Sequence, residues 1–147
     1  MAKESVLFIC THNSARSQMA EGLLRHLAGE RFDVESAGTE QTHVRPLAIQ
    51  AMKELGIDIS SQTSKTLRSL GDRKFDWAIT VCDNANEACP IFPGGTRRLH
   101  WSFDDPSAAT GSDEERLAVF RRVRDEIRGQ IENFLAESNA PPSGAGT

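Results

Sequence analysis

The chain has 147 residues, of which 38% are hydrophobic, with three cysteines and a formal net charge of -4 at pH 7. This length suits one globular domain with a single core, and the weak negative charge gives no long-range attraction toward nucleic acid or anionic membranes. We expect a cytoplasmic protein, because no stretch has the length of a membrane span and no secretory signal precedes the first apolar run. The odd number of cysteines also argues against a fixed disulfide framework in the reducing environment of the cytoplasm.

The first half of the chain alternates between strand-like and helix-like patterns. Residues 6–10, VLFIC, form a continuous apolar run that is typical of a strand covered on both faces. From Ser17 the apolar residues repeat with the period of an amphipathic helix. A second strand is predicted over 31–38, and Pro46 begins a helix that ends at Gly56.

The second half continues this alternation. A third strand is predicted over 75–82, with Cys82 as its last residue, and a fourth over 97–101. Ser112 and Glu115 form a capping-box signature at the start of a long final helix with one apolar stripe. Strands and helices that alternate in this way favour a parallel sheet built from β-α-β units.

We therefore predict an α/β fold with a four-stranded parallel sheet. The predicted domain spans residues 1–136, without internal repeats. Residues 137–147, ESNAPPSGAGT, contain almost no apolar side chains and are expected to form a disordered tail.

The loop CTHNSAR, residues 10–16, joins the first strand to the first helix. Such loops point amides outward at the carboxyl edge of a parallel sheet, and the helix adds its positive end, so the loop is suited to hold an oxyanion. The fork of Arg16 matches two oxygens of a tetrahedral anion, and the same field favours the thiolate form of Cys10. The alternative is that Cys10 is only a small buried side chain at a strand end. The candidate substrate-binding residues are Thr11, His12, Asn13, Ser14, Ala15, Arg16 and Ser17.

Two further cysteines are surplus to a simple oxyanion site. Cys82 ends the third predicted strand and should lie at the same sheet edge as Cys10. Cys89 follows the polar segment DNANEA and precedes Pro90, which predicts a segment able to move. Such a pair beside a reactive thiolate suits thiol-disulfide exchange. Two alternatives remain: Cys82 belongs to the core, or the three cysteines and a histidine hold zinc, although the chain lacks the Cys-x2-Cys spacing of structural zinc sites.

The loop CTHNSARS resembles the phosphate loop of low-molecular-weight protein tyrosine phosphatases and of the arsenate reductases that share their fold. The segments AEGLL, SAGT, HVRPLAIQAMKELGIDIS and FDWAITVCDNANEACPIFPG resemble the reductase branch, and the resemblance extends to about Leu135. It implies a three-layer fold with helices flanking the sheet. It also implies a cytoplasmic arsenate reductase coupled to thioredoxin, and we expect a monomer without a cofactor.

The same resemblance implies roles for individual residues. Cys10 would attack arsenate, and Asp105, in the segment FDDPS, would act as general acid, although its neighbour Asp104 or a purely structural cap remains an alternative. A Cys10-Cys82 disulfide and then a Cys82-Cys89 disulfide would follow, and thioredoxin would reduce the latter. Phosphate and sulfate should compete with arsenate for the loop.

The chain departs from the family pattern at the position of a metal ion. Some reductases of this kind hold potassium near the loop, and here Asn13, Glu21, Ser36 and Thr63 would supply most of the ligands. Lys65 stands where an acidic ligand is expected, so we predict no potassium site and no other metal site. The chain has no tyrosine, which removes an aromatic wall expected beside a phosphotyrosine pocket. The alternative function remains a phosphatase that acts on small aryl phosphates or phosphotyrosine.

Overall fold

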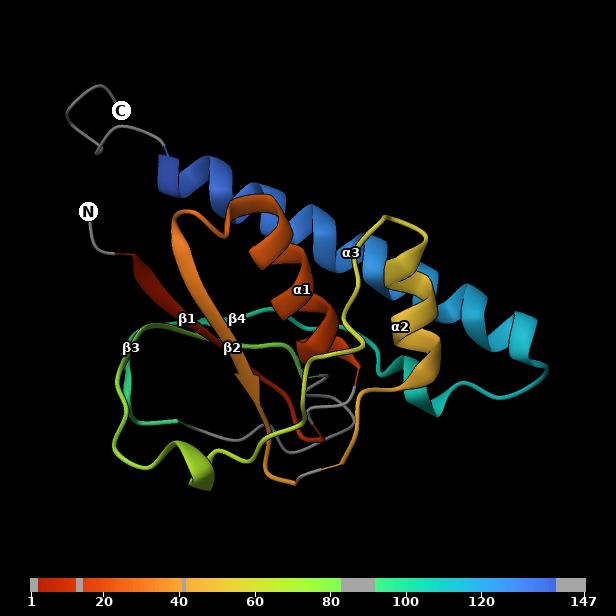
Figure 1. Ribbon diagram of the computed structural model, residues 1–147, viewed down its shortest axis with the longest axis horizontal. Coiled ribbons are helices and arrows are strands. Elements are labelled where there is room, and N and C mark those ends of the chain that lie inside the picture. The colour runs from red at the N-terminus through yellow and green to blue at the C-terminus, as the bar shows by residue number, and fades with distance from the viewer. Residues whose placement is uncertain (1–2, 13–14, 41, 83–91, 140–147) are drawn as a thin grey trace.

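A computed structural model of the chain describes residues 3–12, 15–40, 42–82 and 92–139. Strands and helices alternate along the chain, as the sequence pattern predicts (Figure 1). The elements are β1 (Glu4–Ile9), α1 (Arg16–Ala28), β2 (Phe32–Ala37), α2 (Pro46–Lys53), the 3-10 helix η1 (Arg68–Leu70), β3 (Phe75–Thr80), β4 (Gly95–His100), the 3-10 helix η2 (Pro106–Ala108) and α3 (Asp113–Asn139).

The four strands form one parallel sheet in the order β2-β1-β3-β4. Ile9 at the end of β1 pairs with Ala37 of β2 and with Thr80 of β3, and Thr80 pairs in turn with His100 of β4. The last residues of all four strands therefore lie side by side. The loops that follow the strands meet at this carboxyl edge, which is where an α/β sheet binds ligands.

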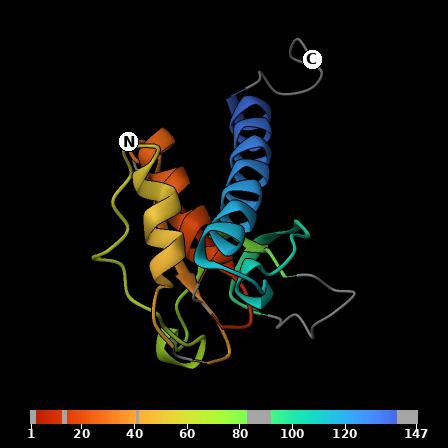
Figure 2. The ribbon, with the colours of Figure 1, turned by 90° about the vertical axis from the view of Figure 1, so that its right-hand side faces the viewer.

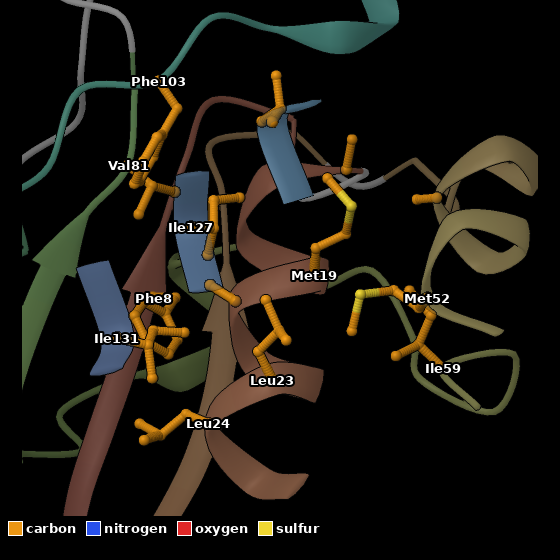
Figure 3. Packing of buried hydrophobic residues seen from close by; sticks show 14 of the residues in the cluster. Phe8, Met19, Leu23, Leu24, Met52, Ile59, Val81, Phe103, Ile127 and Ile131 are labelled. Carbon is orange, nitrogen blue, oxygen red and sulfur yellow. The ribbon is translucent and has the colours of Figure 1, made fainter. Parts of the chain in front are cut away.

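The sheet is the middle of three layers, as the family resemblance implies. The larger core cluster lies between the sheet and the helices α1, α2 and α3, and Phe8, Met19, Met52 and Ile127 are among its members (Figure 3). A smaller cluster on the other face includes Leu7 and Ile9 of β1 and Leu70 of η1. Figure 2 shows the three helices on one side of the molecule and η1 on the opposite side.

The final helix α3 is the longest element, and its start confirms the predicted capping box. The Ser112 backbone N–H donates to the Glu115 carboxylate at 3.0 Å, and the Glu115 N–H donates to the Ser112 hydroxyl at 3.1 Å. The helix continues to Asn139, so it includes the first three residues of the predicted tail. Within the described ranges, no helix combines the length and the apolar character needed to cross a membrane.

Candidate active site

Cys10 is the first residue after β1 rather than its last residue. Its backbone N–H donates to the carbonyl of Ala37 at 3.2 Å, which extends the pairing of β1 with β2 by one residue. Its side chain is 2% exposed and belongs to the core cluster under the helices. The strand thus delivers the Cys10 sulfur to the carboxyl edge of the sheet.

The helix α1 begins six residues later and directs its positive end at the same place. Ala15 occupies the N-cap position and has no polar side chain to cap the first amides. The hydroxyl of Ser17, in the first turn, lies 2.9 Å from the Cys10 sulfur. Asn13 and Ser14, which were predicted to contribute to the oxyanion site, lie outside the described residues.

The segment after β2 holds the outer side of the loop, a role that the sequence analysis missed. The carbonyl of Thr11 accepts the backbone N–H groups of Thr39 at 2.9 Å and Glu40 at 3.2 Å. The Thr42 hydroxyl donates to the carbonyl of His12 at 3.0 Å. These bonds occupy two loop carbonyls, which would otherwise be free to face an anion. The threonines of this segment were the only available signal, and alone they do not predict this contact.

Arg16 is buried, with 2% of its side chain exposed, although it is the first residue of α1. Its Nη1 donates to the carbonyl of Phe103 at 3.2 Å, and its Nη2 lies 3.7 Å from Oδ2 of Asp105. The Arg16 guanidinium group is therefore oriented by the segment that contains Phe103, 87 residues away in the sequence. This contact brings the predicted acid to the predicted anion ligand.

The two neighbouring aspartates have different environments. Asp105 accepts the backbone N–H of Ser107 at 2.9 Å and thereby caps η2, whose first residue is Pro106. Asp104 forms an exposed ion pair with Arg122 of α3, at 3.1 Å. Asp105 therefore does cap the following turn, which was the structural alternative considered for it. It also lies beside Arg16, so the cap does not exclude a role as the acid.

Cys82 lies two residues beyond the end of β3, which stops at Thr80 rather than at Cys82. It is buried, and its sulfur lies 3.8 Å from the carbonyl oxygen of Ile9, the residue that precedes Cys10. Cys10 and Cys82 are both buried and belong to the same core cluster. The expectation that Cys82 shares an edge with Cys10 agrees with this position, and so does the alternative that Cys82 is a core residue. Cys89 lies outside the described residues.

Glu21 was considered as a potassium ligand, and the structure shows that it has a protein cation as a partner. Its carboxylate accepts Arg25 Nη2 and the Ser36 hydroxyl, each at 2.5 Å. Gln18 Nε2 donates to the carbonyl of Thr63 at 3.0 Å. Arg25, which the sequence analysis did not name, thus balances the charge of Glu21. No group of three or more His, Cys, Asp or Glu side chains within the described ranges is arranged to hold a metal ion.

Residues 5–141 match the family model described as low molecular weight phosphotyrosine protein phosphatase. The chain is 52% identical over 134 residues to an arsenate reductase of Halalkalibacterium halodurans and 46% identical to an arsenate reductase of Bacillus subtilis; each alignment covers 91% of this chain and 96% of the relative. It also superposes with a TM-score of 0.77 on a solved structure described as an arsenate reductase in the phosphate binding state, at 35% identity over 91% of this chain and 98% of that one.

Proposed function

Because the chain belongs to the low molecular weight phosphotyrosine protein phosphatase family, we propose that its phosphate loop binds arsenate and that the chain reduces arsenate to arsenite. The similarity to arsenate reductases over nine-tenths of the chain supports this choice of substrate. The observation that carries the proposal is a second cysteine, Cys82, buried at the same sheet edge as Cys10. A hydrolase needs one thiol there, whereas a reductase needs a second one.

The first step is an attack of the Cys10 thiolate on arsenic. The Ser17 hydroxyl stabilises the sulfur anion before the attack, and Arg16 with the loop amides holds the arsenate oxygens. A sulfur-arsenic bond forms and one arsenic-oxygen bond breaks. Asp105 donates the proton that lets the departing oxygen leave as water, and its contact with Arg16 keeps it over the bound anion.

The second step transfers two electrons to arsenic. The Cys82 thiolate attacks the Cys10 sulfur, the electron pair of the sulfur-arsenic bond stays on arsenic, and arsenite leaves. The products are a Cys10-Cys82 disulfide and arsenic in its reduced form. The position of the Cys82 sulfur next to the Ile9 carbonyl supports this step, because it places the attacking atom beside the backbone that carries Cys10.

The third step moves the disulfide away from the phosphate loop. The Cys89 thiolate attacks the Cys82 sulfur, which releases the Cys10 thiolate for the next cycle and leaves a Cys82-Cys89 disulfide. Thioredoxin, acting as a dithiol on a monomer in the cytoplasm, reduces this disulfide. Phosphate and sulfate, which match arsenate in shape and charge, compete for the loop.

The test is a thiol count on the full chain, before and after one equivalent of arsenate and without a reductant. We expect the loss of two thiols per chain together with one arsenite. The variants Cys82→Ser and Cys89→Ser should both fail to turn over with thioredoxin, whereas Cys10→Ser should lose the reaction but keep phosphate binding. Repeated turnover of Cys89→Ser with thioredoxin alone would refute the relay.

Hydrolysis of small aryl phosphates is the second candidate, because Cys10, Arg16 and Asp105 are the residues that such a phosphatase needs. The same variants separate the two functions. Cys82→Ser should retain any hydrolysis of an aryl phosphate, since that reaction needs no second sulfur. A wild-type chain that hydrolyses the ester rapidly and loses no thiols with arsenate would be a phosphatase.

A further inference from the structure

A segment between α2 and η1 lies beside the chain that leads from β2 to the phosphate loop. We call residues 63–67 the support segment. Gly38 and Thr66 form a parallel bridge, and the Gly38 N–H donates to the carbonyl of Lys65 at 2.9 Å. The chain that follows β2 is thereby held in place just before it contacts the phosphate loop.

Ser64 and Thr42 connect the support segment to the loop. Ser64 is 5% exposed, and its hydroxyl oxygen accepts the backbone N–H of Thr42 at 2.9 Å. The hydroxyl of Thr42 donates in turn to the carbonyl of His12 at 3.0 Å. Two successive hydrogen bonds therefore join a buried side chain to the backbone of the phosphate loop, and Thr42 takes part in both.

The support segment is also bonded to the helix at the other end of the loop. Gln18, in the first turn of α1, is buried, and its Nε2 donates to the carbonyl of Thr63 at 3.0 Å. Gln62, just before the support segment, donates from Nε2 to the carbonyl of Gln18 at 3.0 Å. The loop backbone at His12 and the start of α1 are therefore tied to the same short stretch of chain.

The direction of the His12 carbonyl matters for anion binding. A loop binds an oxyanion when its N–H groups converge on the anion, and a carbonyl oxygen that turned toward the same point would repel the negative charge. The neighbouring carbonyl of Thr11 accepts the backbone N–H groups of Thr39 and Glu40, which no side-chain substitution removes. The His12 carbonyl instead accepts a side-chain hydroxyl, so its direction depends on the identity of residue 42.

We propose that Thr42 is a positioning residue of the phosphate loop, that Ser64 positions Thr42, and that both residues thereby raise the affinity of the loop for oxyanions. Both act through the His12 backbone rather than through a contact with the anion. The inference rests on the proposed function only in that the loop binds a tetrahedral anion, and it does not require that arsenate is reduced. Loss of the Thr42 hydroxyl frees the His12 carbonyl to turn, which weakens the binding of phosphate and arsenate alike.

Inorganic phosphate is the probe, and calorimetric titration of the full chain at constant ionic strength measures its affinity. Thr42→Val keeps the shape of the side chain but loses the donor, so phosphate should bind roughly threefold to tenfold more weakly, as for one neutral hydrogen bond. Thr42→Ser keeps the hydroxyl and should restore the affinity to within about twofold of wild type. The double variant Thr42→Val/Ser64→Ala should bind no more weakly than Thr42→Val alone, because both residues act through one carbonyl.

The matched control is Thr96→Val, the same chemical change at an exposed position near the amino end of β4, which should leave the phosphate affinity unchanged. A merely structural role of Thr42 would lower the melting temperature of Thr42→Val without changing the phosphate affinity of the folded chain, and that result would overturn the inference. So would Thr42→Ser binding as weakly as Thr42→Val, an equal loss in Thr96→Val, or a wild-type chain that binds no phosphate. Arsenite formation is measured separately: a chain that shows the expected affinities but forms no arsenite would refute the proposed function and support this inference.

Discussion

The Ser17 hydroxyl oxygen and the Cys10 sulfur lie 2.9 Å apart, although Cys10 follows β1 and Ser17 belongs to α1. The hydroxyl is able to donate to a thiolate, so its removal should make the sulfur less reactive at neutral pH. We expect Ser17→Ala to slow alkylation of Cys10 by iodoacetamide about tenfold, which corresponds to one charge-assisted hydrogen bond. Mass spectrometry of the Cys10 peptide over time measures this rate. Ser69→Ala, which removes an exposed hydroxyl in η1, is the control and should leave the rate unchanged.

Asp105 and Asp104 form a matched pair for testing the general acid. Asp105→Asn keeps the size of the side chain but cannot protonate a leaving oxygen, so we expect a loss of about 100- to 10,000-fold in the single-turnover rate with arsenate. Asp104→Asn breaks only an exposed ion pair with Arg122 and should retain nearly full activity. Phosphate binding should survive in both variants. Equal rates in the two variants would remove Asp105 from the mechanism.

Glu54 couples α2 to α3 and makes stability depend on pH. Its carboxylate accepts Arg121 Nη2 at 2.6 Å and Arg124 Nη1 at 3.0 Å, and hydrogen bonding to Arg121, followed by Arg124, lowers the pKa of Glu54 from 4.5 to about 2. A lowered folded-state pKa stabilises the protein above pH 4.5, and this contribution is lost as the pH falls toward 2. We expect Glu54→Gln to lower the melting temperature at pH 7.

The difference in melting temperature between wild type and Glu54→Gln should narrow steadily below pH 5. Calorimetric scans at several pH values between 7 and 3 measure it. Glu132→Gln, at an exposed pair with Arg128, should show almost no difference at any pH. A gap for Glu54→Gln that stays constant down to pH 3 would contradict the lowered pKa.

Gly22 lies where α1 packs closely against Ile59 and Met52. A Cβ atom at this position would lie 2.5 Å from Cγ2 of Ile59 and 3.3 Å from Cε of Met52. We expect Gly22→Ala to lower the free energy of unfolding by about 1–3 kcal/mol, because overpacking outweighs the gain in helix propensity. Gly129→Ala, in α3 with nothing within 4 Å, should instead raise it by about 0.5–1 kcal/mol. Urea denaturation distinguishes the opposite signs.

Much of the fold is encoded in local patterns, and these were predictable. The apolar run before Cys10, the helical period after Ser17 and the capping box at Ser112 each depend on residues a few positions apart. The structure has the corresponding elements within a few residues of the expected bounds. The early end of β3 at Thr80 shows the limit, because Val81 and Cys82 are as apolar as a strand but lie beyond the last residue paired with β4.

The contacts between remote segments were not predictable in the same way. Arg16 was expected to face an anion, but its bond to the carbonyl of Phe103 depends on the loop after β4. Arg25 lies one turn after Glu21 in α1, so their ion pair follows from the i,i+4 spacing, whereas the bond of Arg25 to the carbonyl of Val34 depends on the packing of α1 on β2. Polar partners of this kind follow from three-dimensional placement, which hydrophobic periodicity does not encode.

The long separation between Arg16 and its partners at Phe103 and Asp105 has a consequence for biosynthesis. During synthesis Cys10, the proposed nucleophile, leaves the ribosome early, whereas Asp105, the proposed proton donor, emerges only after two-thirds of the polypeptide has been made. An unfinished or truncated chain therefore contains a cysteine with no acid and no fixed guanidinium beside it. The reaction therefore requires the complete tertiary structure, and proteolytic loss of the last third of the chain, which contains Phe103 and Asp105, should abolish it.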